Sequence, residues 1–137
     1  MGCIAFDFDD TLTIKVPGSR ALPNFNMINL LREYAAAGHM VVIVTYRCKD
    51  NERREWFSVN EPYRVVISEF VQEHALPVDQ VRFTNHTEKG PVLALLGAHV
   101  HYDDNPEAVA SAEQFGVRGI LVTPGEEREW SMEILAE

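Results

Sequence analysis

The residues best suited to chemistry lie close to the start of the chain. Asp7, Asp9 and Asp10 follow directly on an apolar run, and Thr11 comes next. An apolar run that ends in polar residues is typical of a buried strand, and alternation along that strand places Asp7 and Asp9 on the same side of its end. Two adjacent carboxylates repel each other unless a cation lies between them. At the carboxyl end of a strand, where open α/β sheets bind ligands, the pair indicates a metal-assisted reaction.

Further polar side chains follow later apolar runs. Thr45 ends a valine-rich run, Asp103 and Asp104 end another, and Lys89 opens an expected helix. Parallel strands deliver their carboxyl ends to one edge of a sheet, so these side chains are expected to gather near Asp7. Carboxylates, a hydroxyl and an ammonium group together suit Mg²⁺ and a bound phosphate.

The elements that must position these residues alternate along the chain. Apolar runs separated by helical patterns indicate right-handed crossovers and a parallel sheet with helices on both faces. The expected fold is a Rossmann-like three-layer α/β/α sandwich with a mainly parallel sheet. Strands are predicted over 4–8, 40–45, 81–84, 99–102 and 118–122, helices over 24–37, 49–58, 63–74, 89–96 and 106–115, and a turn or short hairpin over 11–23.

The totals describe one domain of an ordinary globular protein. The chain has 137 residues, 46% of them hydrophobic and 24% charged, which suits a single domain over 1–137. No apolar run approaches the roughly 20 residues that cross a membrane, so we predict a cytoplasmic protein that does not bind membranes. The net charge of −9 disfavours non-specific adhesion to nucleic acid, although it leaves room for a local basic patch.

Two features at the margins leave alternatives open. The acidic segment 126–137 carries Trp130 and other apolar residues, and it fits a peripheral helix, a docked tail or a dimer contact. The two cysteines, Cys3 and Cys48, are expected about 13 Å apart along neighbouring strands at roughly 3.3 Å per residue. That separation exceeds the reach of a disulfide, and reduced thiols agree with a cytosolic location.

The polar strand ends carry a family resemblance. Residues 7–11 resemble the Asp-x-Asp-x-Thr motif of the haloacid dehalogenase (HAD) superfamily of phosphotransferases. The run that ends at Thr45 is similar to the second motif of that superfamily, Lys89 to the third, and the run that ends in Asp103 and Asp104 to the acidic fourth. The motifs appear in the superfamily's order over residues 3–105. This order is more specific than any single motif, because a lone threonine after a valine run means little.

The resemblance implies a role for each motif residue. Asp7 is the expected nucleophile, which forms an aspartyl-phosphate, and Asp9 the expected acid and base. Thr11, Thr45 and Lys89 are expected to bind the phosphate. The resemblance also implies one bound Mg²⁺. Its expected ligands are the Asp7 carboxylate, the Asp9 main-chain carbonyl and Asp103, with Asp104 either binding directly or supporting the site.

The spacing of the motifs narrows the class. Within the superfamily, aspartate at position 9 favours a phosphatase over a dehalogenase or an ion pump. The intervals from Asp9 to Thr45 and from Thr45 to Lys89 hold only elements that the core fold requires, so no cap domain is expected. An open active site tends to serve macromolecular ends, or small substrates where an oligomer supplies the lid.

The substrate is predicted from the residues after Thr45. Thr45-Tyr46-Arg47 is similar to the Ser/Thr-x-Arg of polynucleotide 3′-phosphatase domains, so Arg47 is a candidate phosphate ligand. Lys49, Arg53 and Arg54 make the surroundings of Arg47 basic, although acidic residues lie among them, and Lys15 and Arg20 could extend the patch. We therefore expect a phosphate ester on a nucleotide or polynucleotide end. The alternatives are a small-metabolite phosphatase that works as an oligomer, and a non-catalytic phosphate-binding or regulatory protein.

Overall fold

The computed structural model describes residues 1–135, and a sheet of five parallel strands lies at its centre. The strands are β1 (Cys3–Phe6), β4 (Met40–Thr45), β5 (Gln80–Phe83), β6 (Val100–Asp103) and β7 (Arg118–Leu121). Their order across the sheet is β5-β4-β1-β6-β7, so the chain builds outward from β1 first on one side and then on the other. Ligands bind at such a change of direction in open α/β sheets.

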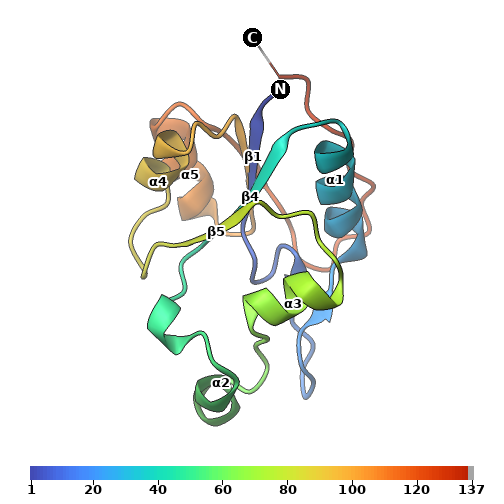
Figure 1. Cartoon of the computed structure of the whole chain (residues 1–137), viewed down its shortest axis with the longest axis vertical. Helices are drawn as coiled ribbons and strands as arrows, with labels where there is room; N and C mark the ends of the chain where they lie inside the picture. Colours follow the sequence, from blue (N-terminus) through green and yellow to red (C-terminus); the bar gives the residue numbers. More distant parts are fainter. Residues whose placement is uncertain (136–137) are drawn as a thin grey trace.

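Helices cover both faces of the sheet (Figure 1). On one face lie α1 (Phe25–Ala36) and α3 (Ile67–Glu73), and on the other lie α4 (Gly90–Leu95) and α5 (Pro106–Gln114). Two apolar cores result, one on each face, with buried members from the adjoining helices. The predicted Rossmann-like three-layer arrangement is therefore confirmed.

The alternation of β1 explains how the sheet positions the site. Ile4 and Phe6 face α1 and belong to its core, whereas Cys3 and Ala5 face α4 and α5. Both sets are buried, which is why the run reads as continuously apolar. Asp7 follows Phe6 just beyond the strand, and its N–H still donates to the Tyr102 carbonyl oxygen over 2.8 Å.

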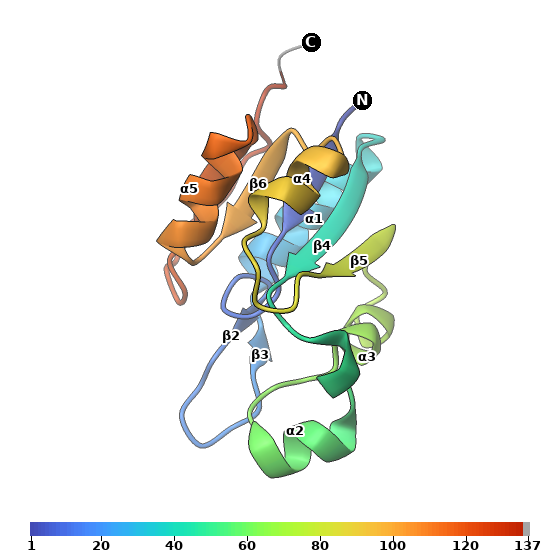
Figure 2. The same cartoon turned by 90° about the vertical axis from the view of Figure 1, so that its left-hand side faces the viewer.

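A lower lobe extends beyond the carboxyl ends of the strands, and we define it as residues 13–23 and 48–66 (Figure 2). It consists of the antiparallel hairpin β2 (Thr13–Ile14) and β3 (Leu22–Pro23), the 3₁₀ helix η1 (Lys49–Asn51), and α2 (Arg54–Asn60). The hairpin expected within 11–23 is confirmed. The Ala21 N–H donates to the Tyr63 carbonyl oxygen over 2.8 Å and joins the two parts of the lobe.

The helices of this region differ from the prediction. The single helix expected over 49–58 is interrupted at Glu52, and the helix expected from residue 63 begins at Ile67. One side chain accounts for both differences. The Glu52 carboxylate accepts hydrogen bonds from the Arg47 guanidinium and from the Ile67 N–H, and it thereby fixes a helix break and a helix start. Tertiary contacts of this kind override helix propensity.

The C-terminal segment packs on the α1 face without forming a helix as far as residue 135. The Trp130 ring lies 5.7 Å from the Tyr102 ring, and the Glu133 N–H donates to the Tyr34 hydroxyl over 2.7 Å. Of the alternatives for 126–137, the described part is a docked tail, and residues 136–137 lie outside the described residues. Within the described chain, no helix combines the length and apolar character needed to cross a membrane.

Candidate active site

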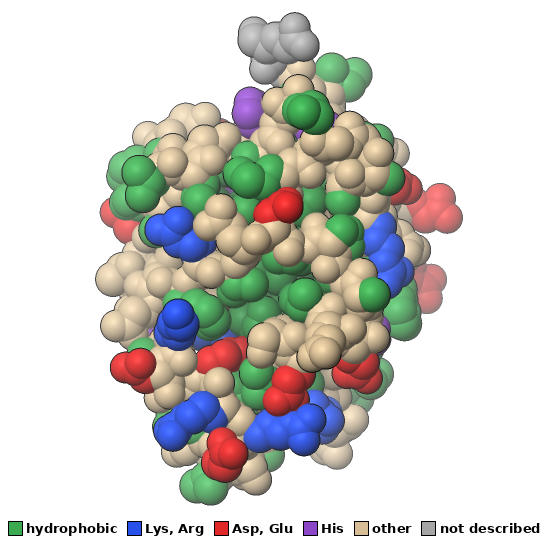
Figure 3. All heavy atoms as spheres, in the orientation of Figure 1, with side chains coloured by type: hydrophobic (Ala, Val, Ile, Leu, Met, Phe, Trp, Pro, Cys, Tyr) green, Lys and Arg blue, Asp and Glu red, His purple; other side chains and the backbone are tan. Residues whose placement is uncertain are grey.

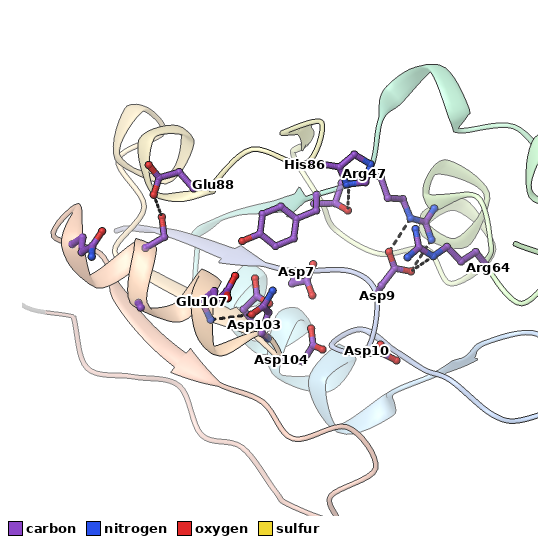
Figure 4. A pocket seen from close by; sticks show the side chains of 16 residues that line it. Asp7, Asp9, Asp10, Arg47, Arg64, His86, Glu88, Asp103, Asp104 and Glu107 are labelled. Atoms are coloured by element: carbon purple, nitrogen blue, oxygen red, sulfur yellow. Dashed lines mark hydrogen bonds and ion pairs between the residues drawn. The ribbon is translucent and has the colours of Figure 1, made fainter. Parts of the chain in front are cut away.

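Most residues singled out by their motifs line one hollow at the carboxyl ends of β1, β4 and β6, whereas Thr11 and Lys89 are fully buried and do not line it. The hollow measures about 750 Å³ and opens to solvent. Asp7 lies at its centre, Asp103, Asp104 and Glu107 lie to one side, and Asp9 lies on the other side with Arg47 and Arg64 (Figure 4). Its lining is Asp7, Asp9, Asp10, Thr45, Tyr46, Arg47, Arg64, His86, Glu88, Asp103, Asp104, Asn105, Glu107, Ala110, Ser111 and Gln114.

A buried lysine joins the two carboxylates on which the site depends. Lys89 Nζ lies 2.8 Å from Asp7 Oδ1 and 2.6 Å from Asp103 Oδ2. The other Asp7 oxygen, Oδ2, accepts the Thr11 hydroxyl over 3.2 Å. Both oxygens of Asp7 are thus held in place, as a nucleophile requires. Lys89 is fully buried, and its ammonium lies 4.7 Å from the centre of the Tyr46 ring.

Lys89 is carried to this position by a close contact between two helices. It immediately precedes α4, as the sequence predicts, and the Gly90 N–H donates to Ser111 Oγ of α5 over 2.9 Å. The Ser111 hydroxyl in turn donates to Glu88 over 2.9 Å. A Cβ on residue 90 would lie 2.6 Å from the Ser111 carbonyl oxygen, so the approach requires glycine.

The pKa values of Asp7 and Lys89 are both raised, although burial acts on the two groups in opposite directions. Burial raises the pKa of Asp7, the positive charge of Lys89 opposes this effect, and the negative charge of Asp103 adds to it. Burial alone would lower the pKa of Lys89, but the charges of Asp7 and Asp103 and the hydrogen bonds to them raise it. Lys89 is therefore a permanent cation between two buried carboxylates.

Asp103 and Asp104 have different surroundings. Asp103 Oδ2 accepts from Lys89 and lies 2.7 Å from His101 Nε2, while Oδ1 accepts the Asn105 N–H over 3.0 Å. Although burial opposes it, the hydrogen bond from His101 and the charge of Lys89 lower the pKa of Asp103 to about 2. Burial and the nearby Asp7 and Asp103 instead raise the pKa of Asp104 to about 8.

These carboxylates fit a hard divalent cation. Asp7, Asp103 and Asp104 each offer one oxygen, and the three oxygens lie within 4.8 Å of one another. Oxygen donors at that spacing suit Mg²⁺. Burial and the negative charges of Asp7 and Asp103 both disfavour an ionised Asp104, and a bound dication would oppose that effect.

Asp7 and Asp9 line the same hollow, as the alternation argument predicts, although their side chains have different partners. β1 ends at Phe6, and the Phe8 carbonyl oxygen accepts the N–H groups of residues 11, 12 and 13, so the backbone turns at this point. Asp9 consequently points toward Arg47 and Arg64 (Figure 4). Phe8 is buried in the core opposite Asp7 and Asp9, as predicted, but β1 ends at Phe6 rather than at the expected residue 8.

Arg47 lies at the pocket but already has several protein partners. It donates to Asp9 Oδ2 over 2.9 Å and to Asp9 Oδ1 over 2.8 Å, a two-point contact. Its remaining contacts are to Glu52 and to the Val65 carbonyl oxygen, and its side chain is only 3% exposed. Burial would lower the pKa of Arg47, but the hydrogen bond to Asp9 and the charges of Asp9 and Glu52 raise it. In this structure the guanidinium therefore holds Asp9 in place.

Thr45 is placed as expected, and Asp10 occupies the turn. The Thr45 side chain is buried at the end of β4, and its Oγ1 accepts the Arg47 N–H over 3.2 Å. Asp10 has a φ of 61°, a left-handed conformation that aspartate tolerates better than most residues. Of the wider basic cluster, only Arg47 lines this pocket, whereas Lys49, Arg53 and Arg54 do not.

Sequence reasoning missed several lining residues. Arg64, Glu88, Glu107 and Ser111 all reach the pocket, and none lies in a motif. His86 also lines it, and residues 85 and 86 both have left-handed backbones, with φ values of 52° and 63°. Asn85 and His86 donate backbone hydrogen bonds to the carbonyl oxygens of Arg47 and Tyr46, which fastens this loop to the end of β4. A loop with that geometry has no reliable sequence signal.

The comparisons with known proteins bear on the fold. No family model and no curated protein matches the chain. Among solved structures, a chain of the Pnkp1/Rnl/Hen1 complex is 14% identical over 90% of this chain and 46% of its own length, with a TM-score of 0.66. A second structure, of the Pnkp1/Rnl/Hen1 RNA repair complex, is 14% identical over 92% of this chain and 44% of its own, with a TM-score of 0.61.

A third structure resembles the chain over most of both lengths. It is the D,D-heptose 1,7-bisphosphate phosphatase from B. bronchiseptica complexed with magnesium and phosphate, 10% identical over 88% of this chain and 80% of its own, with a TM-score of 0.59. By contrast, the present chain spans less than half the length of the two chains from the Pnkp1/Rnl/Hen1 structures. At these identities the likeness concerns the fold alone. The Rossmann-like α/β fold expected from the alternation of strands and helices is confirmed.

Proposed function

We propose that the protein is a Mg²⁺-dependent phosphomonoester hydrolase that acts through an aspartyl-phosphate on Asp7. One observation carries the proposal. A buried carboxylate is held by Lys89 and Thr11 at the centre of an open hollow, and two further carboxylates lie within metal-binding distance of it. Neither a helix cap nor a solvated turn requires a fully buried lysine between two aspartates.

The chain's own residues supply the steps of the reaction. An Asp7 oxygen attacks phosphorus while the bond from phosphorus to the leaving oxygen breaks, and Asp9 gives that oxygen a proton. Asp9 then takes a proton from water, whose oxygen attacks phosphorus and releases inorganic phosphate from Asp7. The two-point contact with Arg47 fixes the Asp9 carboxylate for this work.

Other residues stabilise the charge that develops on the phosphoryl group. Thr45 Oγ1 already accepts a backbone N–H, so its own hydroxyl proton is available for a phosphoryl oxygen. Lys89 offers positive charge behind Asp7 and Asp103, which line the hollow, and burial strengthens its field. Thr11 restrains the nucleophile through its hydrogen bond to Asp7.

The metal ligands follow from the hydrogen bonds of the two acidic residues. The Asp104 carboxyl lies against that of Asp7, and the hydrogen bond between them helps to raise the pKa of Asp104, so a cation could take the place of the shared proton. We therefore assign Asp104, the Asp7 carboxylate and the Asp9 main-chain carbonyl as direct ligands, with Asp103 either binding directly or supporting Lys89. When bound, Mg²⁺ offsets the repulsion between the attacking carboxylate and the phosphate.

The substrate we favour is a phosphate on a nucleotide or polynucleotide end. The hollow is open, arginines lie on its Asp9 side, and two structures of similar fold come from a complex described as an RNA repair complex. The second candidate is a small phosphorylated metabolite handled by an oligomer, which is supported by the fold shared with a heptose bisphosphate phosphatase. The cytoplasmic location stays a prediction, supported by the two free cysteines.

The decisive experiment is phosphate release from p-nitrophenyl phosphate by the purified protein, with MgCl₂ or with EDTA. Asp7→Asn is expected to lower the turnover at least about 10³-fold, because it removes the nucleophile. Asp10→Asn is the matched control in the same loop, and we expect it to retain turnover within about threefold of wild type. Absence of turnover in the wild type with Mg²⁺ would leave the binding-protein alternative as the better explanation.

A further inference from the structure

The lower lobe contains a second hollow beside the active site, which we call the arginine hollow. It measures about 360 Å³, and three arginines line it, Arg20, Arg54 and Arg64. Its remaining lining is Phe57, Ser58, Pro62, Val66 and Glu69.

The three arginines come from different segments that the fold fastens together. Arg20 lies in the loop between β2 and β3, Arg54 is the first residue of α2, and Arg64 lies between α2 and α3. Besides the hydrogen bond between residues 21 and 63, Lys15 Nζ lies 4.2 Å from the centre of the Tyr63 ring. Figures 1 and 2 both show the hairpin beside α2 and α3. The gathering of arginines is therefore a property of the fold rather than of one basic run.

The arginine hollow adjoins the active site through Arg64. This residue lines both hollows, and its Nε lies 4.0 Å from Asp9 Oδ1. Asp9 is the residue that we assign to the leaving oxygen. Because attack and departure are in line, the leaving group extends from phosphorus away from Asp7. The arginine hollow is thus on the Asp9 side of the catalytic pocket, toward which the leaving group extends (Figure 4).

The three arginines of the hollow differ in how far the protein already pairs them. Arg64 lies 3.3 Å from Glu61 Oε2 as well as 4.0 Å from Asp9 Oδ1, and Glu69 is the one carboxylate among the lining residues. Arg54 contacts Glu69 over 2.7 Å, but the two side chains are 78% and 40% exposed, so a phosphate can compete for Arg54. Arg20 forms no ion pair within residues 1–135. Basic side chains gather on this part of the surface, with acidic ones among them, in a chain of net charge −9 (Figure 3).

We propose that the arginine hollow is a binding site for a second phosphate group of the substrate, carried by the leaving group. The guanidinium fork matches phosphate oxygens, and three forks around one hollow exceed what a neutral leaving group would need. This inference rests on the proposed function and narrows it. The substrate is then a nucleoside bisphosphate or a phosphorylated oligonucleotide rather than a simple monophosphate.

The test compares kcat/KM for adenosine 3′-monophosphate, adenosine 3′,5′-bisphosphate and short oligonucleotides with a phosphate at either end. We expect at least a tenfold preference for the substrates with a second phosphate. Arg20→Ala and Arg54→Ala are expected to cut that preference at least threefold each, with a smaller loss on the monophosphate. Arg118→Ala is the control, since Arg118 also pairs with a glutamate but lies at the start of β7.

The outcomes separate this inference from the proposed function. If kcat/KM is equal for the monophosphate and the bisphosphate and the arginine variants do not change it, the arginine hollow is not a phosphate site. The proposed phosphatase activity is unaffected by that result. If no substrate turns over, the phosphatase proposal fails. Titration calorimetry of Asp7→Asn with the same nucleotides then tests the arginine hollow independently of turnover. Equal affinities for the monophosphate and the bisphosphate would refute the second phosphate site. If kcat/KM continues to rise with oligonucleotide length, the substrate is a polynucleotide. If the bisphosphate already gives the full preference, the substrate is a small molecule.

Discussion

Two charged regions lie side by side in this protein, and they are built in opposite ways. At the strand ends, Lys89 is fully buried between Asp7 and Asp103, and each charge has a partner within 2.8 Å. In the arginine hollow, the charges are partly exposed and come from loops and helix ends, and Arg20 forms no ion pair within the described residues. A buried network tolerates little change in position or charge, whereas an exposed one can exchange protein partners for ligand. The first arrangement suits reaction, and the second suits recognition.

The largest effect is expected from removing the cation of the buried network. Lys89→Met leaves Asp7 and Asp103 buried without a counter-ion, so we expect a loss of about 3–5 kcal/mol in unfolding free energy. Turnover should fall about 10³-fold, because the charge that supports the phosphoryl group is lost. Urea unfolding and phosphate release measure the two effects. Lys49→Met, at an exposed lysine, should change stability by less than about 0.5 kcal/mol, and comparable losses in both variants would contradict the contrast.

Arg47 holds Asp9 in place at the catalytic pocket, and its loss should affect one class of substrate most. Arg47→Lys removes the two-point contact with Asp9 but keeps a positive charge. A poorly positioned Asp9 matters most where the leaving oxygen is strongly basic. We expect kcat/KM to fall about 10- to 100-fold on a nucleotide and much less on p-nitrophenyl phosphate. An equal fall on both substrates would mean that Arg47 serves stability alone.

Mg²⁺ should stabilise the protein in a pH-dependent way through Asp104. The pKa of this carboxyl is raised from 3.8 to about 8 in the folded protein. Between those values the folded state retains a proton that the unfolded chain has lost, so stability without metal falls as pH rises. Binding of Mg²⁺ requires the carboxylate. The increase in Tm on adding MgCl₂ should therefore be larger at pH 8.5 than at pH 6, by a few °C.

The matched variant for the metal experiment is Asp104→Asn. It should lose most of the Mg²⁺-dependent increase in Tm and should be more stable than wild type at pH 8.5 in EDTA. If Mg²⁺ stabilises this variant as much as wild type, Asp104 is not a metal ligand.

The sequence predicts the buried network far better than the lower lobe. Asp7, Thr45 and Asp103 follow apolar runs whose parallel pairing brings their ends to one edge, and that topology follows from alternating strands and helices. Lys89 lies directly before α4, as expected from its motif. The strong signals are thus periodicity and the shared edge of a parallel sheet.

The lower lobe depends on contacts that no periodicity encodes. Arg47, from the predicted basic cluster, turns inward to Asp9 and Glu52, and the same glutamate interrupts a helix that its sequence favours. Arg64 follows Thr45 by nineteen positions without any surrounding motif, yet it reaches the pocket. Side-chain partners in loops are chosen by the three-dimensional arrangement, so basic residues can be counted from the sequence but not placed.

The smallest effect is expected where the exposed region is altered, and two glutamates of this part of the molecule give a matched pair. Glu69 pairs with exposed Arg54, whereas Glu52 pairs with buried Arg47. Glu69→Gln should change the unfolding free energy by less than about 1 kcal/mol, because an exposed ion pair contributes little. Glu52→Gln should cost about 1–3 kcal/mol, since it weakens the contacts of a buried guanidinium. Freed from Glu69, Arg54 is available to ligand, so Glu69→Gln should also raise kcat/KM on the bisphosphate about two- to threefold. Urea unfolding of both variants and kinetics on both nucleotides test this, and equal stability losses would show that burial does not distinguish the two pairs.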